Sequence, residues 1–272
     1  MTNIRVVDRR IRVALSLVAS MALALSPLCL RAQTVPARPP DKDIKALIEQ
    51  VEQNRDKFEG NLSGDLKNSK LRGPNGEMDV SDFLKDYKDN INKLKDRFTD
   101  DYSASTELAT VLQQGTRIDV YMKNAPINTK GRSEWDREAA SLKSLAEAYG
   151  TTFPTPEGAP VRRINDKETA QSADAIKTAA DHFKDNIDKN STVPKADRDS
   201  AKKEVEKLSK LADAVKSRAS DGKPASAEFQ QLVTQTAKVQ SWIDAHPVPA
   251  ASADWLDVQQ QMTKLRQAFG MR

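Results

Sequence analysis

The amino-acid sequence predicts an all-α protein. It is expected to be a tandem duplication of a four-helix-bundle-like unit, with about eight helices behind an N-terminal signal peptide. Apolar residues recur at three- and four-residue spacing through long polar segments, and alternating strand patterns are absent. Prolines fall between these segments, where helices must end. A skeleton of Trp, aliphatic, Ala, aromatic and Gly residues at 135–150 returns at 255–270.

Residues 1–32 have the layout of a secretory signal peptide. A basic start precedes an apolar run and then small residues, so we expect export to the periplasm or beyond, with cleavage near Ala32 or Gln33. Serines and a proline interrupt the apolar run, which argues against a retained membrane span. Cys29 follows a bulky leucine, which disfavours a lipid anchor. The pair Arg9-Arg10 leaves the twin-arginine route as a minor alternative.

Removal of this segment changes the charge balance. The whole chain has 43 basic and 39 acidic side chains and a formal net charge of +4. Residues 1–32 hold five arginines and one aspartate, so the mature chain carries 38 of each sign and is neutral. A nucleic-acid-binding protein needs a surplus of Lys and Arg, so no nucleic-acid partner is expected. The only cysteine leaves with the signal peptide, so no disulfide is expected.

Residues 33–40 are predicted to be a Pro-rich tail, and residues 41–150 to form the first helical unit. Its first helix should run from about Asp41 to Ser69, where a loop with the sequence LRGPNGEMD follows. Asp79 or Ser81 can cap the second helix, because both side chains accept hydrogen bonds from the first free backbone N–H groups.

Two further helices complete the first unit. The third is predicted from Ser105 to about Tyr121, and Gly115 within it marks either a close helix contact or a weak point. Ser133 should cap the fourth helix, which has acidic residues in its first turn. Gly150 can provide the left-handed residue that ends this helix.

Residues 151–165 read as a Pro- and Gly-containing linker, and residues 166–272 as the second helical unit. Asn165 with Glu168 forms a plausible capping box for its first helix. The remaining three helices are predicted to begin near Pro194, Ser226 and Ser252, and the last to end at Gly270.

Alignment of the two units pairs their predicted core residues. The pairs are Phe58 with Phe183, Leu108 with Phe229, Tyr121 with Trp242, Trp135 with Trp255, Leu145 with Leu265, and Tyr149 with Phe269. A Trp and an aromatic ring fourteen residues later are almost four helical turns apart, so they face the same side. Repeat units preserve the positions that face their shared core. These residues are therefore interpreted as interior packing and not as a ligand cage.

Several segments resemble an uncharacterised family of exported bacterial helical-repeat proteins. They are Asp-x-Phe-x-x-Asn-Leu, a helix of the type FLKDYKDNINKLKDRFTDDYSASTELATVL, and Trp followed by Leu-x-x-Leu-Ala-x-Ala-Tyr. The segment from Arg162 to Asp166 resembles the one that opens the repeat in such sequences. The resemblance implies a helical bundle and an envelope location. It brings no assigned activity and no functional residues.

The residues that usually carry chemistry are scarce. His182 and His246 are the only histidines, and a zinc site usually needs at least three converging protein ligands. Motifs for haem, di-iron, calcium, phosphate loops and nucleophile elbows are absent from the sequence. The acid pairs Asp41/Asp43 and Asp100/Asp101 are interpreted as solvated helix ends. We therefore expect no cofactor, no metal and no catalytic residue.

The leading functional hypothesis is a non-catalytic interaction or structural protein of the periplasm, bound to an unknown protein or envelope component. No integral membrane segment is expected in the mature chain. The alternative is a small-molecule or anion binder with a pocket inside a bundle or between the units. In that case Arg162 and Arg163 are the possible anion contacts. The competing interpretation is that they are a solvated pair of linker residues. An enzyme is the least favoured class.

Overall fold

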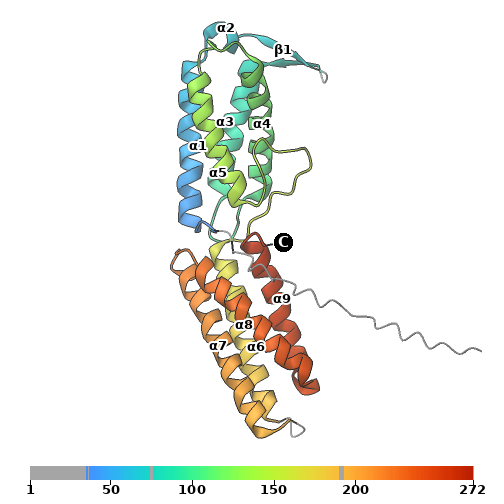
Figure 1. The fold of residues 1–272 in the computed structure, drawn as a ribbon. Helices are drawn as coiled ribbons and strands as arrows, with labels where there is room; N and C mark the ends of the chain where they lie inside the picture. Colours follow the sequence, from blue (N-terminus) through green and yellow to red (C-terminus); the bar gives the residue numbers. More distant parts are fainter. Residues whose placement is uncertain (1–34, 36, 74–75, 190–192, 272) are drawn as a thin grey trace, which may run out of the picture. The chain divides into compact units, whose positions relative to one another are not determined.

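The computed structural model describes residues 35, 37–73, 76–189 and 193–271, and this part of the chain is almost entirely helical (Figure 1). The predicted all-α fold is thereby confirmed. The predicted signal peptide lies outside the described residues, so export stays a prediction. Within the described residues, no helix combines the length and the apolar character that a membrane crossing requires.

The first four long helices form one bundle. They are α1 (Asp41–Asn61), α3 (Val80–Arg97), α4 (Ser105–Asn124) and α5 (Arg132–Ala148). Helix α1 packs against α5 and α3, and α4 packs against the same two helices. A continuous apolar core runs between them.

The last four long helices form a second bundle with its own core. They are α6 (Asp166–Asp188), α7 (Lys195–Ser220), α8 (Ser226–Ala245) and α9 (Ser252–Ala268). A short 3₁₀ turn, η1 (Pro249–Ala251), leads into α9. Helix α6 packs against α7 and α9, and α8 packs against α7.

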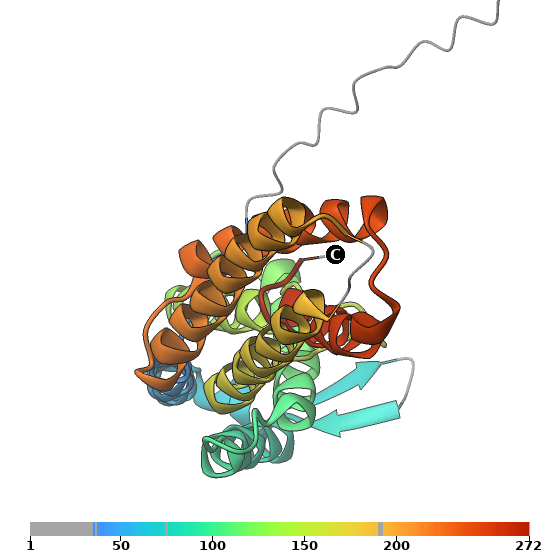
Figure 2. The ribbon, with the colours of Figure 1, turned by 90° about the horizontal axis from the view of Figure 1, so that it is seen from below.

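The first helix is shorter than predicted, and the expected loop after it is a β-hairpin. Helix α1 ends at Asn61, and the Ser63 hydroxyl accepts a hydrogen bond from the Leu66 N–H to cap the short helix α2 (Gly64–Lys67). Strands β1 (Lys70–Gly73) and β2 (Gly76–Asp79) then pair antiparallel and project sideways beyond the helices of their bundle (Figure 2). Ser63 and Gly64 explain why α1 ends early, because glycine has a low helix propensity and serine favours the start of a new helix.

Three of the predicted helix boundaries show how well local signals place helix ends. The Asn165 side chain accepts a hydrogen bond from the Glu168 N–H at 2.7 Å, as its predicted capping role requires. Gly150 follows α5 with a φ of +70°, which confirms the left-handed stop. The predicted Ser133 cap is wrong. Gly131, with a φ of +86°, precedes α5, and the Ser133 hydroxyl bonds to Glu134 instead.

An aromatic pair recurs in both bundles. The rings of Phe58 and Trp135 lie 5.2 Å apart, and those of Phe183 and Trp255 lie 5.4 Å apart. Each indole N–H donates to a side chain of the preceding helix: Trp135 to Asp119 at 3.2 Å, and Trp255 to Gln240 at 2.6 Å. Buried indoles need such a partner, and both bundles provide it in the same place.

The other predicted core pairs lie in the two interiors, with one exception. The buried members are Leu108, Leu145, Tyr149, Phe229, Leu265 and Phe269. Tyr121 and Trp242 are only half-buried at the edges of the two cores. The ring of Trp242 stacks on His246 at 5.1 Å.

Replacement of Gly115 by Ala should destabilise the protein by about 1 kcal/mol or more, because an added Cβ would lie 2.8 Å from Leu142 Cδ1 and 3.2 Å from the Phe153 ring. Leu142 is fully buried, so its side chain has little room to move. Chemical denaturation of the variant measures this loss.

Gly60→Ala is the matched control, since a Cβ at that helical position meets no atom within 4 Å. It should be neutral or stabilise the protein by up to about 1 kcal/mol through helix propensity. Equal effects of the two variants would contradict the close contact at Gly115.

Candidate functional site

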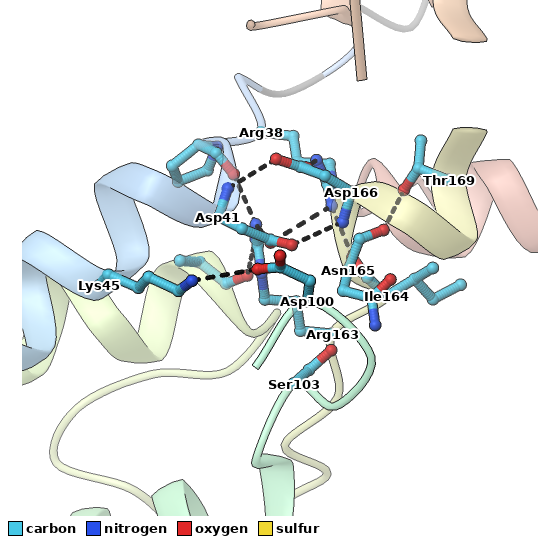
Figure 3. A network of polar contacts seen from close by, with 12 residues as sticks. Arg38, Asp41, Lys45, Asp100, Ser103, Arg163, Ile164, Asn165, Asp166 and Thr169 are labelled. Atoms are coloured by element: carbon cyan, nitrogen blue, oxygen red, sulfur yellow. Dashed lines mark hydrogen bonds and ion pairs between the residues drawn. The ribbon is translucent and has the colours of Figure 1, made fainter. Parts of the chain in front are cut away.

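The N-termini of α1 and α6 meet at a buried cluster of charges, shown in Figure 3. Asp41 and Asp166 are the first residues of these helices. The Asp41 N–H donates to Asp166 Oδ2 at 2.8 Å, and the Asp166 N–H donates to Asp41 Oδ2 at 2.7 Å. Each carboxylate therefore caps the helix that the other one begins, although the two residues are 125 positions apart.

Two arginines complete the cluster, and each of them binds the segment to which the other one belongs. Arg38 Nη1 donates to Asp166 Oδ1 at 2.5 Å, and its Nη2 donates to the carbonyl oxygen of Ile164 at 2.6 Å. Arg163 Nη2 donates to Asp41 Oδ1 at 2.8 Å and to the carbonyl oxygen of Pro39 at 2.7 Å. Each arginine thus binds the aspartate and the backbone of the opposite R-x-x-D segment.

The aromatic surroundings of the two arginines also correspond. The guanidinium carbon of Arg38 lies 5.9 Å from the centroid of the Phe269 ring, and that of Arg163 lies 5.9 Å from the centroid of the Tyr149 ring. Phe269 and Tyr149 are the paired residues that close α9 and α5. We call Arg38, Asp41, Arg163 and Asp166 the junction network. Its contacts are related by an approximate twofold exchange.

Helix electrostatics explains why acids stand at the centre of the junction network. Each helix N-terminus carries a partial positive charge of about half an elementary charge, so two such ends in contact would repel. The Asp41 and Asp166 carboxylates offset both ends and pair with the arginines. Burial, and next to it the charge of Arg163, lower the pKa of Arg38, while Asp166 opposes this shift. All four charges are neutralised within the network, which leaves none to bind a substrate.

Exposed ion pairs surround the junction network. Lys45 Nζ lies 3.0 Å from Asp100 Oδ1, and Lys167 pairs with Asp101. Lys45, Asp100 and Lys167 border a cleft of about 570 Å³, whose wall also holds Lys42 and the pair Lys216–Asp174. Three of the four lysines that line this cleft are therefore paired with carboxylates.

The structure corrects three sequence-based interpretations. Arg163 is buried with its charge bound to Asp41, so the solvated-linker interpretation is wrong for this residue, and its guanidinium is not free for an external anion. Asp41 is buried and is not a solvated helix end. Arg38, expected in a tail, is 8% exposed, and its N–H donates to Ser226 of α8. Arg162 is exposed, as a linker residue should be.

A second polar cluster lies inside the first bundle. Glu138 of α5 is fully buried, and the hydroxyl of Tyr87 on α3 donates to its Oε1 at 2.7 Å. Arg55 of α1 is 1% exposed, and its Nη1 bonds to Asp56 at 2.8 Å and to Glu59 at 3.2 Å. We call Arg55, Tyr87 and Glu138 the buried triad.

The second bundle has a purely apolar version of this cluster. Ala180 and Val258 correspond to Arg55 and Glu138 in the two-unit alignment, and the offset of 121 residues that pairs Leu108 with Phe229 places Leu208 at Tyr87; all three are fully buried. The fold therefore does not require polar side chains at these places. The buried triad is a property of the first bundle alone, and no motif in the sequence marks it.

Burial dominates the titration of the buried triad. Desolvation raises the pKa of Glu138 to about 8, against the hydrogen bond from Tyr87 and the charge of Arg55, which lower it. Desolvation, and then the Glu138 carboxylate, raise the pKa of Tyr87 well above its usual value. The first bundle thus contains a carboxyl group that holds its proton near neutral pH.

The histidines lie apart from both clusters. His182 is on α6, and His246 follows α8 and stacks on Trp242. Within the described residues, three or more His, Cys, Asp or Glu side chains nowhere gather as a metal site would require. Comparison of the chain with protein-family models, curated proteins and solved structures gives no match.

Arg163→Met should destabilise the protein by about 3 kcal/mol, because Asp41 would stay buried without its charged partner. Arg38→Met should have a similar effect through Asp166. The free energy of unfolding from urea titration measures both.

Arg162→Met, at the neighbouring exposed position, is the control and should change stability by less than about 0.5 kcal/mol. If Arg163→Met were as mild as this control, the junction network would not hold the folded state together.

The Glu138 titration predicts a pH dependence of stability. The folded state keeps this proton up to a pKa of about 8, while the unfolded chain releases it near 4.5. The contribution of protonated Glu138 to the free energy of unfolding is therefore fully present below about pH 4.5. It is lost as the pH rises to 8, by at most about 1.4 kcal/mol per pH unit. Glu138→Gln should remove this slope and stabilise the protein relative to wild type increasingly from pH 5 to pH 8.

Unfolding titrations at pH 5, 6, 7 and 8 measure the slope. Glu147→Gln, at an exposed position of the same helix, should keep the wild-type slope. A constant difference between wild type and Glu138→Gln across this range would show that Glu138 is ionised in the fold.

Proposed function

We propose that the chain is an exported, non-catalytic protein of the cell envelope, in which two copied helical bundles present their outer faces to a protein or envelope partner. The observation that carries this proposal is the junction network, because its buried charges bind one another across the two bundles. A catalytic site needs polar groups directed at a substrate. In the described residues, the charged side chains of the junction network bind one another and join the two bundles.

The reciprocal contacts support a duplication. Arg38 and Arg163, Asp41 and Asp166, and Tyr149 and Phe269 exchange equivalent contacts across the junction. Together with the repeated Phe–Trp pairs, they favour two copies of one ancestral unit. Such a self-complementary contact is what a symmetric dimer of single bundles would use, so we infer that fusion of two such units gave this chain. The resemblance to exported helical-repeat proteins fits this origin and stays a prediction.

The charge balance favours the exported form. The excess of positive charge lies in residues 1–32, where a basic start serves membrane targeting, and the remainder is neutral and free of cysteine. A neutral chain with mixed charges suits protein or surface contacts better than nucleic acid. Exposed apolar side chains on two helices, Val120 on α4 and Leu256 on α9, are candidate contact points.

Fractionation and intact-mass measurement of the expressed full chain test the proposal. We expect to find the protein in the envelope fraction. Its mass should correspond to a chain that starts at Gln33 or close to it. A cytoplasmic protein with the mass of the uncleaved chain would contradict export.

Photo-crosslinking in cells tests the interaction role in the same strain. A photoreactive residue at Val120 or Leu256 should give discrete heavier adducts, and one at the exposed charged position Lys210 should not. Arg163→Met should weaken the adducts while the protein is still exported. Adducts that are equally strong at all three positions would contradict a specific surface.

A further inference from the structure

The first bundle contains an apolar cavity at the end where α1 finishes. It has room for about 60 Å³, roughly twice the share of one water molecule in the liquid. Phe58, Ile118 and Met122 line its floor. These three side chains offer no partner for the hydrogen bonds of a water molecule, so this part of the cavity favours an apolar group.

The roof of this cavity is an addition peculiar to the first bundle. Residues 62–79, with α2 and the hairpin, separate α1 from α3, whereas only residues 189–194 separate α6 from α7. Leu66, Leu71 and Met78 of this addition line the cavity and stay half-exposed. Partly exposed apolar side chains around an opening are typical of a ligand site and cost solvation when it is empty.

Two polar groups of α4 stand at the same cavity without a partner. The Arg117 guanidinium makes no hydrogen bond or ion pair with another described residue, and the same is true of the Tyr121 hydroxyl. Arg117 is exposed and Tyr121 half-buried, which places the charge toward solvent and the apolar lining toward the core. A guanidinium binds a carboxylate through two parallel hydrogen bonds.

We propose that this pocket binds a carboxylic acid with a single, medium-length alkyl chain. The end of the alkyl chain lies against Phe58, Ile118 and Met122, its middle against Leu71 and Met78, and the carboxylate pairs with Arg117 and Tyr121. Met78 and Met122 suit this ligand, because the thioether side chain adapts its shape to flexible apolar groups. The site involves neither the junction network nor the candidate partner contacts Val120 and Leu256, although Arg117 and Val120 are both exposed on α4.

Methionine methyl resonances provide the direct test with the mature chain, residues 33–272. Its four methionines are Met78 and Met122 at the cavity and Met262 and Met271 in the second bundle. Titration with octanoate should shift the first two signals in a saturable way and leave the last two unchanged. Absence of a saturable shift at Met78 and Met122, or equal shifts of all four signals, would overturn the proposal.

The carboxylate contact is tested by variants and by a second ligand. Arg117→Gln should weaken octanoate binding about fivefold and leave octanol binding unchanged, because octanol shares the alkyl chain without the charge. Arg266→Gln is the matched control, at an exposed arginine of the second bundle whose side chain likewise has no partner among the described residues, and it should bind octanoate as wild type does. Equal octanoate affinity of the two variants would overturn the assignment of Arg117.

Discussion

The structure depends on the exchange of two aspartates between two helix N-termini. Each of these carboxylates accepts the first N–H of the other helix, and each also binds the arginine that belongs to the opposite segment. Buried ion pairs add little net stability, because desolvation consumes most of the attraction. Their value lies in geometry. Any displacement at this junction would leave four buried charges and two N–H groups unpaired, so the contact selects one arrangement.

Both bundles extend from this fixed point, and they differ most at a distance from it. Helix α1 rises about 30 Å between Asp41 and Asn61, and the hairpin and its cavity lie at the far end. In the interior, the buried triad replaces residues that are apolar in the second bundle. The junction network requires the same residue types from both halves, whereas the outer end of one bundle can change without the other.

Sequence reasoning predicted the helices well because the information for them is local. The periodic apolar residues, the Asn165 cap and the Gly150 stop each act within a few residues of their own position. The hairpin was missed because Ser63 and Gly64 outweigh an apolar pattern that continues past them. The junction network was missed for a different reason. Arg38 and Asp41 look like a solvated tail and helix end until Arg163 and Asp166 meet them, and that contact joins positions 125 residues apart.

A signal for the junction network was nevertheless present in the sequence. Arg-x-x-Asp occurs several times in the chain, but at 38–41 and 163–166 its aspartate is the first residue of the first helix of a bundle. A capping acid explains one aspartate of this kind, but it does not explain an arginine three residues before it, because the helix N-terminus repels a cation. Recurrence of this unfavourable arginine before both helices indicates that its partner lies elsewhere, and the nearest candidate is the aspartate at the start of the other bundle. The same reasoning separates Arg163 from its neighbour Arg162, which has no equivalent before α1 because residue 37 is an alanine.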